Sequence, residues 1–311
     1  MTFYSQKLMY TDFAPLTLAK TFKMMYRLQD WYHDVLAQAD PRVQVLPLSG
    51  SPVPMLSIVA LYVVLVTLGP KWMEHKKPVK LTNLLIVYNF LMVFLSGVVF
   101  LDTVMIIVKE KYSPFCQEVD YSDSRSGWHG IRIGWCFFFL KLIELLDTIF
   151  FVLRKKNSQI TFLHVYHHAT MVIATWLGMK FVPGGNSFLH PMINSLVHVV
   201  MYTYYGMSAI GPHMQKYLWW KRYLTMFQLT QFVIMVSHSF INIISDCNFP
   251  KIFNKVVIVY ASSIMLLFIN FYQKAYIQRR PTKHTQIKKH HVTNGNHYIN
   301  GITPVFGKKE D

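Results

Sequence analysis

Histidines at helical spacing are the residues of this chain whose types and positions first suggest chemistry. His164, His167 and His168 occupy positions i, i+3 and i+4 of a largely apolar stretch, so a helix would place all three on one face. Imidazole can serve as a general base, as a nucleophile or as a metal ligand. A lone buried histidine is usually a hydrogen-bonded core residue, but three on one helix face predict a reactive site.

Three further apolar stretches carry polar side chains with the same periodicity. The first holds Lys141, Glu144 and Asp147, followed by Thr148. Because a charged group at the centre of a membrane costs about 2.5–3.5 kcal/mol, each of these needs a compensating partner or a role. The other two stretches hold Asn194, His198, Met201, Tyr202 and Tyr205, and then Thr225, Gln228, Gln231 and His238.

Each of these clusters also has a purely structural explanation. An ion-pair network can join helices, tyrosine stripes are often packing surfaces, and buried amides can link neighbouring helices. With that alternative open, we predict a catalytic set and a substrate-binding set. The catalytic set is His164, His167, His168, His198, Lys141, Glu144 and Asp147, and the substrate-binding set includes Asn194, Tyr202, Tyr205, Gln228 and Gln231.

Two kinds of enzyme could use such a cluster. HxxHH patterns ligate two irons in membrane desaturases and hydroxylases, but those sites need around eight histidines. Only five histidines lie clearly inside apolar stretches here, and Lys141 is a poor neighbour for a cation. The second chemistry uses imidazole directly, as a base or as a nucleophile that forms an acyl-imidazole. We expect the second chemistry, with no metal and no cofactor, and keep the di-iron desaturase or hydroxylase as the alternative.

Seven stretches must position these groups, because about 20 apolar residues suffice to span a bilayer. The predicted spans are 53–70, 84–108, 133–153, 160–179, 188–208, 223–245 and 254–273. The sequence therefore predicts an all-α integral membrane protein with seven transmembrane helices over 51–274. Residues 1–50 form an N-terminal segment whose amphipathic part lies on the membrane surface, and 275–311 form a basic tail that we expect to be disordered. A seven-span receptor or proton-coupled transporter is the alternative outside enzymes.

The net charge of +16 is unevenly distributed along the chain. One set of alternate loops and the C-terminal tail carry 18 basic and three acidic residues, whereas the other side carries 12 basic and 10 acidic residues. The positive-inside rule therefore predicts a cytosolic C-terminus and a lumenal N-terminus, and this distribution argues against nucleic acid as the partner. Lys308 and Lys309 match a dilysine signal that retrieves cytosolic tails to the endoplasmic reticulum.

Two of the three cysteines fall in loops on the lumenal side of this topology. Cys116 lies between the second and third spans, and Cys247 lies between the sixth and seventh. Because the lumen is oxidising, we predict a disulfide between them, with two free thiols as the alternative. Cys136 falls inside the third span, where it serves as a small apolar residue.

The four polar stretches together resemble the signature boxes of the very-long-chain fatty acid elongases (the ELOVL family). The boxes are Lys141-x-x-Glu-x-x-Asp147-Thr148, His164-x-x-His-His168, His198-x-x-Met-Tyr-x-Tyr-Tyr205 and Thr225-x-x-Gln-x-x-Gln231. Their order and spacing agree with the family, and the resemblance extends from about residue 30 to about residue 275. The chain is most similar to the branch that acts on saturated, monounsaturated and very long chains.

The resemblance implies a 3-oxoacyl-CoA synthase of the endoplasmic reticulum membrane. It would condense a long-chain acyl-CoA with malonyl-CoA to give a longer 3-oxoacyl-CoA, with release of carbon dioxide and CoA. Six of the seven helices would form a barrel around an acyl tunnel, and the basic loop residues Arg154, Lys155 and Lys156 would hold CoA phosphates. The implied partners are the two CoA substrates, the lipid bilayer, a second copy in a homodimer, and other enzymes of the elongation cycle.

The histidines divide the roles in the mechanism that we expect from this resemblance. His167 would attack the thioester to form an acyl-imidazole, with His164 and His168 orienting or activating it. His198 would donate a proton, or hold the enolate or thioester oxygen.

The other polar groups would hold charge and substrate. Lys141, its charge set by Glu144 and Asp147, would stabilise the oxyanion. Gln228 and Gln231 would position the thioester carbonyl.

Overall fold

The computed structural model describes residues 16–245 and 247–278. The predicted dilysine pair, Lys308 and Lys309, and nearly all of the predicted tail lie outside these residues. The chain divides into two compact units, residues 1–269 and 270–311. All of the side chains discussed below belong to the first unit, and every regular element in the described residues is helical.

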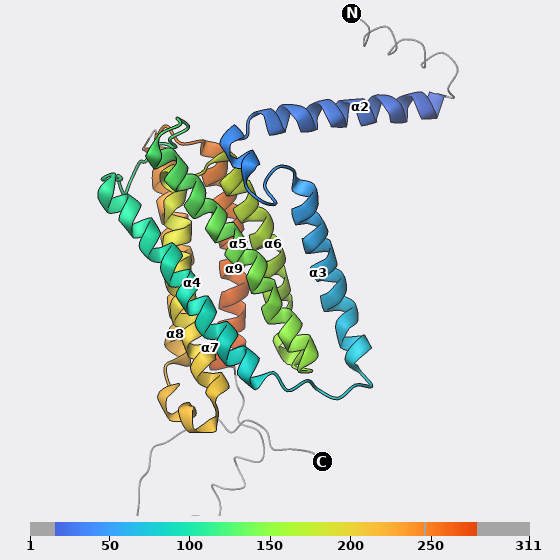
Figure 1. The fold of residues 1–311 in the computed structure, drawn as a ribbon, viewed down its shortest axis with the longest axis vertical. Helices are drawn as coiled ribbons and strands as arrows, with labels where there is room; N and C mark the ends of the chain where they lie inside the picture. The colour runs from blue at the N-terminus through green and yellow to red at the C-terminus, as the bar shows by residue number, and fades with distance from the viewer. Residues whose placement is uncertain (1–15, 246, 279–311) are drawn as a thin grey trace, which may run out of the picture. The chain divides into compact units, whose positions relative to one another are not determined.

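Eight α-helices account for most of the described chain (Figure 1). They are α2 (Leu16–Ala37), α3 (Pro52–Met73), α4 (Thr82–Lys109), α5 (Arg125–Leu153), α6 (Phe162–Phe181), α7 (Leu189–Ile210), α8 (Lys221–Ile244) and α9 (Lys251–Tyr272). Short 3₁₀ turns lie at Pro41–Val45, Asn157–Gln159, Gly185–Phe188 and Pro212–Tyr217, and a π-helical turn lies at Gln273–Ile277. The prediction of an all-α chain is confirmed, and each predicted span falls within one helix or overlaps most of it.

Helix α5 extends beyond the start of the predicted third span, residue 133. Helix α5 begins at Arg125, because the side chain of Ser124 caps it by accepting a hydrogen bond from the amide of Gly127 at 2.9 Å. The first turns of α5 are polar, so hydropathy alone gave no sign of them.

Within residues 16–245 and 247–278, four helices are long and apolar enough to cross a membrane: α3, α4, α8 and α9 with its continuation to Ile277. Helices α5, α6 and α7 are long enough, but they carry the polar boxes that lower their hydropathy. The sequence therefore supports four spans by composition, and the seven-span topology stays a prediction for the other three.

Helix packing places α5 at the centre of several contacts. Helix α5 packs against α3, α4 and α6, and α7 packs against α4 and α8. Helices α4 and α7 run closely together where Gly206 faces Phe90, since an added Cβ at Gly206 would lie 3.2 Å from the Phe90 ring. Phe232 of α8 packs with Ala261 and Ile264 of α9, so α9 packs against α8 through these side chains.

One end of the bundle is covalently joined. Cys116, after α4, and Cys247, after α8, form a disulfide. We call this the disulfide end; α5, α7 and α9 begin there, and α4, α6 and α8 end there. The turn between α6 and α7 lies at this end too, with Gly184 and Gly185 at φ of 91° and 54°, a conformation that favours glycine. The side chain of Asn186 bonds to the Asn242 amide and to Cys247 Sγ.

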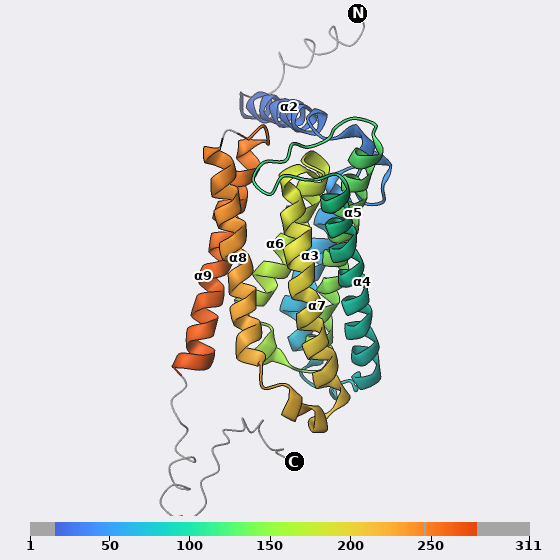
Figure 2. The ribbon, with the colours of Figure 1, turned by 90° about the vertical axis from the view of Figure 1, so that its left-hand side faces the viewer.

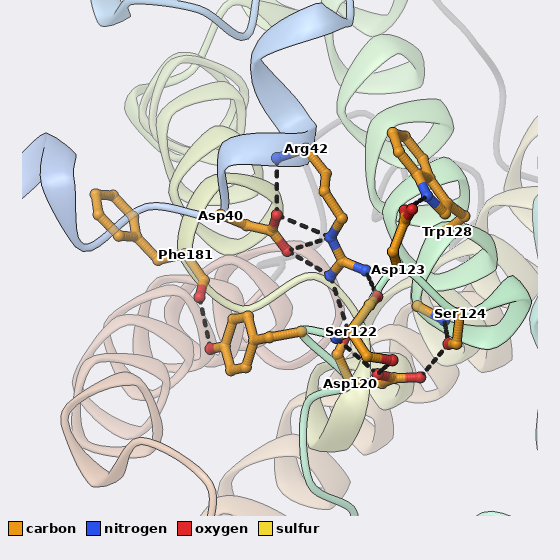
Figure 3. A network of polar contacts seen from close by, with 10 residues as sticks. Asp40, Arg42, Asp120, Ser122, Asp123, Ser124, Trp128 and Phe181 are labelled. Carbon is orange, nitrogen blue, oxygen red and sulfur yellow. Dashed lines mark hydrogen bonds and ion pairs between the residues drawn. The ribbon is translucent and has the colours of Figure 1, made fainter.

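A second tether at the disulfide end joins the segment after α2 to the loop before α5 (Figure 3). The Arg42 guanidinium pairs with Asp40 and donates to the carbonyl oxygens of Asp120 and Ser122. The hydrogen bonds with Asp40 raise the pKa of Arg42. Burial alone would raise the pKa of Asp120, but hydrogen bonds from Ser122 and Ser124 outweigh it and lower that pKa.

Helix α2 runs crosswise to the helices of the bundle at the disulfide end and extends outward past α3 (Figures 1 and 2). It covers the predicted amphipathic stretch, and large apolar side chains remain exposed on it, among them Met24, Leu28 and Trp31. That position suits a helix lying on a membrane surface, which stays a prediction.

Candidate active site

A buried charge cluster joins α5 to α7. The Lys141 ammonium lies 2.7 Å from Glu144 Oε1 and donates to Asn194 Oδ1 at 2.6 Å. The same Glu144 oxygen lies 2.9 Å from Nδ1 of His198. Lys141 and Glu144 are each 2% exposed, so their charges are held by each other rather than by water. The Glu144 carboxylate therefore contacts both the Lys141 ammonium and the His198 imidazole.

Asp147 stands apart from this cluster. Although it shares a helix face with Lys141 and Glu144, its carboxylate accepts a hydrogen bond from the Tyr202 hydroxyl at 2.7 Å. The Tyr202 ring is fully buried and lies edge-on to Tyr88 of α4 at 6.1 Å. The structure therefore divides the three charged groups that we predicted as one set. Lys141 and Glu144 pair with each other, whereas Asp147 pairs with Tyr202.

Helix α3 supports the histidine box of α6 through Thr148 of α5. The Thr148 hydroxyl lies 2.8 Å from Nε2 of His164 and 2.9 Å from the Tyr62 hydroxyl of α3. The His164 and His168 rings are 4.2 Å apart at their centroids, and His167 and His168 are 5.6 Å apart. The three imidazoles are therefore neighbours, as the i, i+3, i+4 spacing predicted.

His167 faces a cavity of about 620 Å³ within the bundle. Residues of α4 to α9 line this cavity, and most of the lining is apolar. Asn194 of the charge cluster lines it as well, and it extends to Phe181 and Gly184 at the disulfide end. Nδ1 of His167 is buried and makes no hydrogen bond, so this ring is less constrained than that of His164. The cavity therefore joins the His167 imidazole to a long apolar space.

The predicted substrate-binding residues do not all reach this site. The Asn194 amide donates to Gln231 Oε1 at 3.3 Å, which places Gln231 in the charge cluster. Gln228 instead donates to Met201 Sδ at 3.4 Å. Tyr205 is 44% exposed and meets Tyr202 only edge-on, at 6.3 Å.

The basic loop residues lie at the end opposite the disulfide. Lys155 donates to the carbonyl oxygens of Glu74 and Lys76, so it ties the loop between α3 and α4 to the loop after α5. Arg154 caps the C-terminus of α5 through its backbone, and Lys156 directly follows Lys155. These positions put all three at the same end of the bundle as the start of α6, which carries the histidine box.

Two residues of the site were not singled out from the sequence. Tyr62 supports Thr148, and Tyr88 packs on Tyr202. A tyrosine facing inward from an otherwise apolar span was the available signal, because a buried hydroxyl needs a partner. Among the described residues, no group of three or more His, Cys, Asp or Glu side chains is arranged to hold a metal ion.

Residues 47–284 match the GNS1/SUR4 family (ELO). The chain belongs to this family. Human very long chain fatty acid elongase 4 is 47% identical over 257 residues, which cover 82% of this chain and 81% of the relative. Rat very long chain fatty acid elongase 7 is 46% identical, covering 81% and 91%, and human very long chain fatty acid elongase 1 is 45% identical, covering 79% and 89%. The ELO family match agrees with the resemblance carried by the four polar boxes, and it favours elongation over the di-iron alternative. With its apolar helices, this ELO family member is a multi-pass membrane protein.

Proposed function

We propose that this protein is the condensing enzyme of fatty acid elongation, a 3-oxoacyl-CoA synthase that joins a long-chain acyl-CoA to malonyl-CoA. The observation that carries the proposal is that His167 of α6 lines an apolar cavity, while the Lys141–Glu144–His198 cluster lies on α5 and α7. An acyl chain suits the apolar cavity, and a thioester suits the polar end. The names of the related elongases support the same reaction.

The first half-reaction uses His167. Its imidazole nitrogen attacks the thioester carbonyl, the carbon–sulfur bond breaks, and CoA leaves with the imidazole proton, which gives a neutral acyl-imidazole. The Lys141 ammonium stabilises the oxyanion of the tetrahedral intermediate, because it is bonded to Asn194, which lines the same cavity as His167. Glu144 keeps that ammonium in place.

The second half-reaction uses malonyl-CoA. Loss of carbon dioxide leaves an enolate whose carbon attacks the acyl carbonyl, and the imidazole of His167 departs and regains a proton. His198 supplies that proton or holds the enolate oxygen, since Glu144 orients its ring. His164 and His168 keep His167 in position, and Gln231, which accepts a hydrogen bond from Asn194, positions the thioester carbonyl. The reaction needs no cofactor, because every step uses imidazole, ammonium or carboxylate groups of the chain.

The seven-span barrel is part of this proposal. Helix neighbours run from α4 to α5, α6, α9, α8, α7 and back to α4, with α3 outside against α5 and α6. We place the disulfide end in the lumen of the endoplasmic reticulum, because a disulfide forms in an oxidising compartment. The N-terminus is then lumenal, the C-terminus is cytosolic, and Arg154, Lys155 and Lys156 meet CoA phosphates at the cytosolic mouth. A homodimer, and association with other enzymes of the elongation cycle, complete the proposal.

The test is to incubate the purified protein with labelled acyl-CoA alone, and then with malonyl-CoA. We expect a hydroxylamine-labile acyl group on His167, which is lost in His167→Ala and kept in His75→Ala, a change in an exposed loop. Adding malonyl-CoA should convert the label to 3-oxoacyl-CoA. If label never stays on the protein and product needs both substrates together, the histidines act only as bases. If no condensation occurs at all, the proposed function is wrong.

A further inference from the structure

Two polar groups at the disulfide end of the cavity have no role in the reaction above. His190 lies in the first turn of α7, and Asn254 lies in the first turns of α9. Both residues line the cavity that His167 faces. Both also carry a buried atom without a hydrogen-bond partner, Nε2 of His190 and Nδ2 of Asn254. Buried polar atoms are nearly always paired, so two unpaired ones on one cavity need an explanation.

The chemistry of the two atoms is complementary. Nδ1 of His190 lies 3.2 Å from the carbonyl oxygen of Ser187, which can only accept, so Nδ1 carries the proton. Nε2 of the neutral ring is then an acceptor, whereas Nδ2 of Asn254 is a donor. The cavity end therefore offers one acceptor and one donor. A hydroxyl group both donates and accepts, a methyl group does neither, and a carboxylate only accepts.

The position of these atoms relative to the reactive end sets which part of a substrate they meet. At about 1.5 Å per residue, α6 runs about 21 Å from His167 to Phe181. His190 and Asn254 lie toward the far end of this run, and the lining between is mostly apolar. A chain whose carbonyl is at His167 thus brings its last carbons to His190 and Asn254.

We propose that the disulfide end of the cavity is a subsite for a terminal hydroxyl, so that the enzyme elongates ω-hydroxyacyl-CoA of matching length. The proposal rests on the function proposed above. The hydroxyl donates to Nε2 of His190 and accepts from Nδ2 of Asn254. In the apolar middle of the cavity the same hydroxyl has no partner, so shorter ω-hydroxy chains bind poorly.

The test compares ω-hydroxyacyl-CoA and methyl-terminated acyl-CoA at graded chain lengths, with malonyl-CoA and the purified full chain. The ratio of kcat/KM for hydroxy over methyl should be low for short chains and rise about tenfold at the length that reaches the subsite. His190→Leu and Asn254→Leu should each remove this rise and leave methyl-terminated chains active. Ser96→Ala, a buried position in α4 outside the cavity lining, should keep it.

Two outcomes overturn the subsite. One is a hydroxy-to-methyl ratio of kcat/KM in the wild-type protein that does not change with chain length. This measurement does not depend on the folding of any variant. The other is an unchanged rise in both leucine variants. Elongation of methyl-terminated chains in either case leaves the condensing function intact, whereas no elongation of any acyl-CoA shows that the proposed function itself is wrong.

Discussion

Nδ1 of His198 lies 2.9 Å from Oε1 of Glu144, so a carboxylate on α5 contacts an imidazole on α7. The Lys141 ammonium approaches the same oxygen at 2.7 Å. Glu144 therefore lies against both a cation and an imidazole, and its replacement should affect both.

Glu144→Gln should inactivate and destabilise the protein. The buried Lys141 ammonium would lose its counter-charge, which costs about 3–5 kcal/mol of folding free energy. His198 would lose its orienting carboxylate, and kcat for elongation should fall about 100-fold or more. Thermal unfolding in detergent and an elongation assay measure the two effects.

The double variant Lys141→Met/Glu144→Gln is the control for the charge argument. It removes the uncompensated ammonium, so it should recover most of the lost stability while remaining inactive. Equal instability of the double and single variants would contradict the counter-charge role.

Thr148→Val should lower kcat about tenfold and cost about 1–3 kcal/mol of stability, because it leaves the Tyr62 hydroxyl and Nε2 of His164 without their partner while keeping the side-chain shape. Tyr62→Phe should have a smaller effect of the same kind. Thr67→Val is the matched control, since the Thr67 hydroxyl bonds only to its own helix. Activity of Thr148→Val equal to wild type would show that His164 needs no such support.

Tyr202→Phe should destabilise the protein by about 1–3 kcal/mol, because the buried Asp147 carboxylate loses a donor. Asp147→Asn should cost a similar amount, and the two changes combined should cost less than their sum. A double-mutant cycle on thermal unfolding measures this coupling. Additive effects would mean that the 2.7 Å contact contributes nothing to stability.

Cys116→Ser and Cys247→Ser should each lower the unfolding free energy by about 2–5 kcal/mol, since the disulfide closes a long loop. Both variants should run differently from wild type on a non-reducing gel after cleavage between the cysteines. Cys136→Ser, which removes a free thiol within α5, should change neither result. Two free thiols in a mass map of the wild type would contradict the structure.

Acid should weaken the tether at the disulfide end. Asp120 has a lowered pKa in the folded protein, so below about pH 4 the unfolded chain takes up its proton more readily than the folded one. Stability from Asp120 is therefore present above that pH and is lost as the pH falls through the folded pKa. Asp120→Asn should flatten this acid-side fall in melting temperature, and Asp30→Asn on α2 should not.

The sequence predicted the helices and most of the site because both depend on local spacing. The His164, His167 and His168 pattern needs only helical periodicity, and the structure brings these rings together as that periodicity implies. The spans of the apolar helices followed from hydropathy alone.

What could not be predicted depends on how helices rotate against one another. Periodicity put Glu144 and Asp147 on one face, but only packing decides that one meets His198 and the other Tyr202. The contact of Tyr62 with Thr148 joins α3 to α5, and nothing in either segment specifies the other. Tyr205 shows the same limit, because it shares a stripe with the buried Tyr202 and is nevertheless exposed.

The polar boxes also constrain how the helices are inserted into the membrane. Helices α5, α6 and α7 carry the lysine, carboxylate and histidine side chains of the candidate site and fall short of the hydropathy that α3, α4, α8 and α9 reach. A segment holding Lys141, Glu144 and Asp147 enters hydrocarbon readily only once its partners are present to neutralise it. Helices α5, α6 and α7 should therefore be inserted together with their more apolar neighbours, and substitutions that break the Lys141–Glu144 pair should first show as failed membrane insertion.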